Sequence, residues 1–128
     1  IRLHCDSASG TGFTTYIPAQ QGIDRGFRGP SESVLKASRR KGEIFHTALA
    51  AGLKGKLRDN GLKGDQATAV GSRHGALIGS IYSKVPVVLV EMAVLTNPSD
   101  EAFLSSSAGR AAMADALAAG VVAVLRSK

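Results

Sequence analysis

Hydrophobic residues change their spacing along this chain in a way that separates strands from helices. Ile1–Cys5 and Phe13–Ile17 are short apolar or β-branched runs next to small polar residues, Gly and Pro, which is typical of β-strands. From Ser31 to Leu57 apolar residues recur every three or four positions, and this spacing predicts a long helix. A last, alanine-rich helix is expected over Ala108–Leu125.

The strongest strand signal is the apolar stretch Val87–Val90, which lies just after Pro86. It is apolar at every position, as in strands that are covered on both faces of a parallel sheet. Further on, Asn97-Pro98 followed by acidic residues has the signature of a helix start. These elements predict an α/β fold with a twisted, mostly parallel sheet flanked by helices, in a single domain over residues 1–128.

Three segments give weaker signals. Ala19–Pro30 is rich in Gly and carries both charges, so we expect an irregular, exposed loop. Asp59-Asn60-Gly61 has the composition of a turn. Ala76–Tyr82 fits either a strand or a short helix, and a strand is preferred.

The chain is strongly basic, with a formal net charge of +6 and a pI near 9.9. This charge favours an anionic partner, such as nucleic acid or an acidic cell-envelope polymer, although a soluble basic domain needs neither. The densest basic group, Lys36 with Arg39-Arg40-Lys41, has no aromatic residues beside it to stack on bases, so it is most simply a solvated helix face. No apolar run approaches the roughly 20 residues of a membrane span. Neither a nucleic acid nor a membrane is therefore the expected partner.

Glu91 stands directly after the apolar stretch, where burying an unpaired carboxylate would cost several kcal/mol. In open α/β sheets, ligands gather at the carboxyl ends of strands. We expect one strand to end at His4 and another at Glu91, so the two side chains share an edge if their strands run the same way in one sheet. An imidazole ligand and a carboxylate base would suit a metal-assisted hydrolase.

The neighbouring reactive residues have more ordinary interpretations. Asp6 lies on the same side of its strand as His4, where it either orients the imidazole as a second-shell acceptor or opens the following loop. Cys5, the only cysteine, should face away as a small apolar residue. We expect His46 to be exposed on its helix, and His74 to lie in a Gly-rich loop without lining a groove.

Two motifs carry a resemblance to a known family. His4-Cys5-Asp6 at the end of a strand is short, whereas Pro86, the apolar run, Glu91 and Asn97-Pro98 form a long and specific pattern. Together they resemble the zinc-dependent N-acetylmuramoyl-L-alanine amidases, which act on bacterial cell walls, and the likeness extends over nearly the whole chain.

The resemblance implies a function and its residues. His4 would be a zinc ligand and Glu91 the general base on zinc-bound water, in hydrolysis of the amide between N-acetylmuramic acid and L-alanine in peptidoglycan. No residue is assigned to any other cofactor. The resemblance also implies an extracytoplasmic location in the cell wall, the periplasm or the medium.

The same resemblance requires a further His and Glu upstream of the His4 strand, and nothing in this sequence precedes Ile1. We therefore interpret residues 1–128 as the carboxyl-terminal portion of an amidase catalytic domain. The alternative is a non-catalytic relative that lacks a complete metal site and binds cell-wall polymer through its basic surface. The sequence does not indicate the oligomeric state or the peptidoglycan chemotype.

Overall fold

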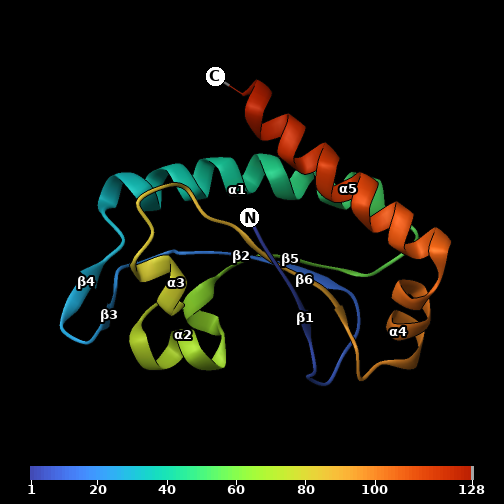
Figure 1. The fold of residues 1–128 in the computed structure, drawn as a ribbon, viewed down its shortest axis with the longest axis horizontal. Helices are drawn as coiled ribbons and strands as arrows, with labels where there is room; N and C mark the ends of the chain where they lie inside the picture. Colours follow the sequence, from blue (N-terminus) through green and yellow to red (C-terminus); the bar gives the residue numbers. More distant parts are fainter. Residues whose placement is uncertain (128) are drawn as a thin grey trace.

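The computed structural model describes residues 1–127 of the chain. In Figure 1 the two long helices, α1 (Glu32–Leu53) and α5 (Ser107–Arg126), lie above a central sheet, and the short helices α2 (Ala69–His74) and α3 (Ile78–Ile81) lie below it. Helix α4 (Pro98–Ser105) lies at one end of the sheet, beside the start of α5. The sheet therefore has one face under the long helices and one face turned away from them.

The central sheet has four strands in the order β1-β6-β2-β5. β1 (Arg2–Asp6) pairs in parallel with β6 (Leu89–Val94), and β2 (Phe13–Ile17) pairs in parallel with β5 (Asp59–Gly64). The junction between the two pairs, β6 with β2, is antiparallel. The predicted α/β fold with a mostly parallel sheet flanked by helices is confirmed.

Helix α1 begins at a polar cap and ends earlier than predicted. Ser31 precedes it, and the Ser31 hydroxyl accepts a hydrogen bond from the backbone N–H of Val34. The helix ends at Leu53 instead of Leu57, and Gly55 follows with a φ of 74°. Its buried face forms the core together with the sheet and α5: Phe13, Ile17, Phe45, Leu49, Leu53, Val88, Val90, Met113 and Ala116.

Small residues allow α1 and α5 to pack closely. A Cβ on Gly52 would lie 2.7 Å from the Cβ of Ala116, and a Cβ on Gly120 would lie 2.7 Å from the ring of Phe45. Near the end of α5, Val124 still packs against the core, whereas Leu125 is 78% exposed. At 20 residues and a mean hydropathy of 1.5, α5 is long and apolar enough for a membrane span, although in this structure it packs on α1.

The segment expected to be an irregular loop contains a hairpin. β3 (Gly22–Asp24) and β4 (Phe27–Gly29) pair in antiparallel fashion. Arg25 and Gly26 connect them with φ values of 49° and 80°, and two positive φ angles are the requirement of a two-residue turn that matches strand twist. The prediction of an irregular loop was wrong because Arg25-Gly26 lacks the Asn-Gly or Asp-Gly sequence that usually marks a two-residue hairpin turn.

Two other local predictions were also wrong. Asp59-Asn60-Gly61 begins strand β5 instead of forming a turn, because Gly61, with a φ of 87°, allows a bulge opposite β2. After the short 3-10 turn η1 (Asp65–Ala67) and α2, the segment Ala76–Tyr82 contains helix α3. The carbonyl of Leu77 accepts hydrogen bonds from two N–H groups of this turn, so no strand ladder forms.

Candidate functional site

Strands β1 and β6 bring His4 and Glu91 side by side. The two residues are register partners in the parallel pair, so their side chains leave the same face of the sheet on adjacent strands. The two strands run the same way in one sheet, which meets the condition that the sequence left open. Since 86 residues lie between them in the sequence, only the fold creates this pair.

The predicted position at the strand ends was wrong. β6 begins at Leu89 and continues to Val94, so Glu91 lies in the middle of the strand. β1 likewise continues past His4 to Asp6, which pairs with Val94 across an irregularity in the register. The pair therefore lies on the face of the sheet and not at its carboxyl edge.

We call the face of the sheet turned away from α1 and α5 the site face. Val90 and Met92 contact the helix-covered core, so the alternation of β6 places Glu91 on the opposite side. Across the antiparallel junction, the partner of Glu91 is Thr14 of β2. A row of polar side chains from three strands, His4, Glu91 and Thr14, thus crosses the site face.

Glu91 is half-buried, and its Oε2 atom is buried without a hydrogen-bond partner among residues 1–127. Burial raises the pKa of this carboxyl, the negative charge of Asp6 raises it further, and His4 lowers it. A carboxylate with a raised pKa holds a proton more strongly, which suits a general base. The unpartnered oxygen also marks a place where a polar group from outside the described residues would be stabilised.

Asp6 and Cys5 flank this pair. The Oδ1 atom of Asp6 accepts a hydrogen bond of 2.7 Å from the N–H of Ser7, so this carboxylate opens the loop that follows β1. The half-buried thiol of Cys5 has a raised pKa, first because of burial and then because of the charge of Glu91. A protonated thiol is a weak nucleophile and a weak metal ligand.

The loop after β1, residues 7–12, is fixed by the start of α4. Asp100 is 1% exposed and accepts hydrogen bonds from the N–H of Gly12 at 2.7 Å and the N–H of Val94 at 3.0 Å. The Thr11 hydroxyl donates to the same carboxylate at 2.6 Å, and Asn97 donates its amide to the carbonyl of Gly10 at 3.0 Å. Residues at the start of α4 therefore fix the conformation of the loop that follows β1.

The ionisation of Asp100 follows from these contacts. Burial on its own would raise the pKa of the carboxyl, but the hydrogen bonds from Thr11, Val94 and Gly12 outweigh it, and the pKa is lowered. The role of Asp100 as an anchor was not predicted from the sequence, although an acid in the first turn after Asn97-Pro98 was a visible signal. Asn97 does cap α4 as predicted, accepting from the N–H groups of Ser99 and Asp100.

The other two histidines lie away from Glu91. His46, expected to be exposed, is only 15% exposed at its side chain, and its Nδ1 lies 3.0 Å from the Thr15 hydroxyl. Its Nε2 lies 3.4 Å from Asp59, so His46 connects α1 to the helix-covered face of the sheet. His74 lies 3.2 Å from the carbonyl of Ile23 and so contacts the β3–β4 hairpin.

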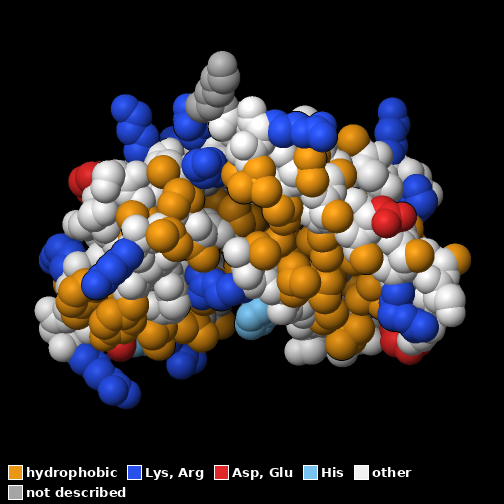
Figure 2. Space-filling view, turned by 45° about the horizontal axis from the view of Figure 1, so that its top comes forward, with side chains coloured by type: hydrophobic (Ala, Val, Ile, Leu, Met, Phe, Trp, Pro, Cys, Tyr) orange, Lys and Arg blue, Asp and Glu red, His pale blue; other side chains and the backbone are white. Residues whose placement is uncertain are grey.

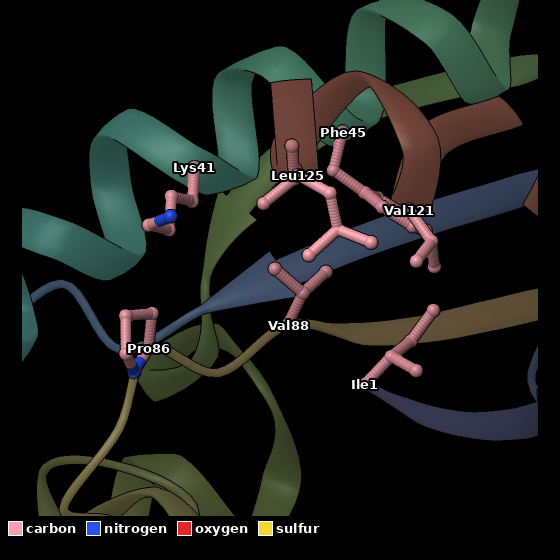
Figure 3. Close-up of a pocket in the computed structure, with 8 residues that line it drawn as sticks. Ile1, Lys41, Phe45, Pro86, Val88, Val121 and Leu125 are labelled. Carbon is pink, nitrogen blue, oxygen red and sulfur yellow. The ribbon is translucent and has the colours of Figure 1, made fainter. Parts of the chain in front are cut away.

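An apolar pocket of about 190 Å³ lies on the other side of the sheet. Figure 3 shows Phe45 of α1 and Val121 and Leu125 of α5 around it, with Val88 and Ile1 below. In the view of Figure 2, apolar side chains gather over the centre of the molecule. Since Val88 faces the helix-covered core, this pocket is separate from Glu91.

Within residues 1–127, no three His, Cys, Asp or Glu side chains come close enough together to hold a metal ion. Catalytic zinc sites use three protein ligands and leave one position open. His4 offers a nitrogen donor of the right kind, and the buried, unpartnered oxygen of Glu91 lies on the neighbouring strand. The residues present therefore fit one side of a zinc site.

Comparison with solved structures supports the architecture. Ami1 from Mycobacterium smegmatis, an N-acetylmuramyl-L-alanine amidase, is 23% identical with a TM-score of 0.73 and covers 98% of this chain and 53% of its own. The apo form of Ami1 from Mycobacterium abscessus is 25% identical with a TM-score of 0.71, and the match covers 96% of this chain and 52% of that structure. The catalytic domain of CwlV from Bacillus (Paenibacillus) polymyxa var. colistinus is 22% identical with a TM-score of 0.68, and the match covers 98% of this chain and 56% of that structure. The chain thus spans about half the length of each of these structures.

No curated protein matches the chain. A family model described as N-acetylmuramoyl-L-alanine amidase, in contrast, matches residues 1–123. This match extends from the His4 strand through Glu91 and well into α5. The chain therefore belongs to the N-acetylmuramoyl-L-alanine amidase family.

Proposed function

We propose that this protein takes part in hydrolysis of the amide between N-acetylmuramic acid and L-alanine in peptidoglycan. The observation that carries the proposal is the pairing of His4 with Glu91 on adjacent parallel strands, in a chain of the amidase family. Since peptidoglycan lies outside the cytoplasmic membrane, the proposal includes an extracytoplasmic location.

Glu91 is the proposed general base. Its carboxylate would accept a proton from the attacking water and then deliver that proton to the leaving amine. The raised pKa supports both steps, because the protonated form must persist long enough to act as an acid. Thr14, the cross-strand partner of Glu91, is only 8% exposed and limits the directions from which water reaches the carboxylate.

His4 is the proposed zinc ligand, and the remaining ligands would come from outside the described residues. When bound, zinc polarises the amide carbonyl and lowers the pKa of water. We also propose that Asp6 orients the imidazole of His4 by accepting a hydrogen bond from it when zinc is bound. Its negative charge in addition raises the pKa of Glu91. The four-stranded sheet keeps the spacing between imidazole and carboxylate constant.

A second candidate function is binding of cell-wall polymer without hydrolysis. The observation that favours it is that residues 1–127 do not by themselves assemble three metal-binding side chains. The formal net charge of +6 would serve attraction to anionic wall polymers.

The distinguishing experiment uses His4→Ala in the longest natural protein that contains this chain. Loss of an outer-shell partner already costs about 10- to 100-fold in metal affinity or activity, so loss of a ligand should cost more than about 100-fold. Zinc content after purification and clearing of purified cell walls measure the two effects. His74→Ala is the matched control, because the His74 ring contacts Ile23 and Asp24 of the β3–β4 hairpin, and this variant should keep both zinc and activity.

Unchanged zinc content in His4→Ala would remove His4 from the ligand set. A wild-type protein that binds cell walls, contains no zinc and clears nothing would support the polymer-binding function instead.

A further inference from the structure

A second polar row crosses the site face next to the row that contains Glu91. Tyr16 of β2 is the register partner of Lys63 in the parallel strand β5 and of Leu89 in β6. Leu89 precedes Glu91 by two residues, so Tyr16 and Lys63 lie on the same face of the sheet, one row away. Burial raises the pKa of the Tyr16 phenol, and the charges of Asp6 and Glu91 raise it further, so the phenol lies within electrostatic reach of both carboxylates.

A pocket of about 250 Å³ connects these two rows. Asp6 and Thr14 line the side near Glu91, and Tyr16, Lys63, Arg58 and Asn60 line the rest. One wall is the loop after β1, which Asp100 fixes through a buried and a half-buried hydrogen bond and Asn97 through an exposed one. Asn60 also holds this wall, donating its amide to the carbonyl of Thr11 at 2.8 Å. The pocket is therefore preformed.

The charge of the pocket selects an anion. Arg58 and Lys63 are exposed, and within residues 1–127 neither side chain has an ion-pair partner. Asp6 is the one acid in the lining, so the cations outnumber it. A carboxylate is well suited to a site with a lysine, an arginine and a phenol hydroxyl, because charge-assisted hydrogen bonds are the stronger ones.

The pocket's position relates this anion to the proposed reaction. An amide cleaved beside Glu91 has the sugar on one side and the peptide on the other. Once the lactyl carboxyl is bound in the amide, the sugar side carries no negative charge, whereas peptide carboxylates remain free. The group that enters a cationic pocket next to Glu91 is therefore on the peptide side.

We infer that the pocket between the loop after β1 and strand β5 binds a carboxylate of the stem peptide, with Lys63 as the residue that determines this specificity. The inference rests on the proposed function. It extends that function by naming the side of the substrate that is recognised and by predicting discrimination between acidic and amidated peptides.

The test measures binding separately from hydrolysis, in the longest natural protein that contains this chain. Two probes are needed: a peptide that begins with L-alanine and has free carboxylates, and the same peptide with its carboxylates amidated. Wild-type protein should bind the acidic peptide more tightly by calorimetry. Lys63→Gln should reduce that affinity by about tenfold and leave the affinity for the amidated peptide unchanged.

The matched control is Lys36→Gln, the same change of charge on the outside of α1, which should alter neither affinity. Equal binding of the two peptides by wild-type protein would overturn the inference. So would an equal loss in both lysine variants, or inorganic phosphate competing as well as the acidic peptide. Preference for the acidic peptide in a protein that clears no cell walls would instead reject the proposed hydrolysis and keep the pocket.

Discussion

The two faces of the central sheet are built by the same strands and serve opposite purposes. On the face under α1 and α5, Phe13 and Val90 are 1% and 0% exposed and belong to a closed apolar core. On the site face, Thr14 and Glu91, the next residues along each strand, form a polar row with His4. Because side chains alternate along a strand, a residue that stabilises the core and a residue that forms the site can be direct neighbours in the sequence.

The two faces also obtain their rigidity in different ways. The helix-covered face is held by close packing, as where Gly42 approaches Ile17 so closely that a Cβ on the glycine would lie 2.6 Å from it. The site face depends on buried hydrogen bonds at its border, above all those of Asp100. Changes on the two faces should therefore have different consequences.

The largest expected effect is on the site face. Glu91→Gln should lower amide hydrolysis by about 100- to 10,000-fold, because the proton acceptor is lost while the shape is kept. Stability should not fall. The raised pKa of Glu91 means that its ionisation costs stability as the pH rises through the folded-state value, and the neutral amide lacks that cost. Cell-wall clearing and thermal unfolding measure the two outcomes, and normal turnover would exclude Glu91 as the base.

The next effect concerns the border between the faces. Asp100→Asn should lower the free energy of unfolding by about 3 kcal/mol at pH 7, because an amide nitrogen would face N–H donors in a buried position. Urea unfolding at a series of pH values measures the change.

The pH dependence of this loss has a defined sign. Asp100 has a folded-state pKa below its ordinary value of 3.8, so its stabilisation is fully present above that value. It is lost as the pH falls through the lowered folded-state pKa. The difference between wild type and variant should therefore narrow in acid, and a constant difference down to the lowest pH would contradict this assignment.

The smallest of the three effects is on the helix-covered face. Val90→Ala, one residue from Glu91, should lower the free energy of unfolding by about 2 kcal/mol through the cavity it creates. Hydrolysis per folded molecule should be unchanged, because the side chain points into the core. A loss of activity comparable to that of Glu91→Gln would show that the two faces are not separable.

Sequence analysis succeeded where periodicity extends over many residues. The spacing from Ser31 onward predicted α1, and Asn97-Pro98 marked the start of α4, because caps and amphipathic faces are local properties. Whether the His4 and Glu91 strands run the same way in one sheet could not be decided from the sequence, and the structure shows that they do.

It failed where tertiary contacts decide the conformation. The Asp59-Asn60-Gly61 segment has turn composition, yet pairing with β2 makes it a strand with a bulge. His46 lies off the apolar stripe of α1, yet Thr15 and Asp59 bind it from other elements. The Tyr16–Lys63 pair was invisible because β2 and β5 are separated by the whole of α1.

His4 faces Glu91 because of the register between β1 and β6, and a strand register can shift. Deleting one residue of β1 ahead of His4 would reverse the direction of every later side chain in that strand. The imidazole would then be turned toward the helix-covered side of the sheet and away from the acid, with backbone pairing intact. The length of β1 ahead of His4 is therefore as necessary to the site as the identity of the two functional groups.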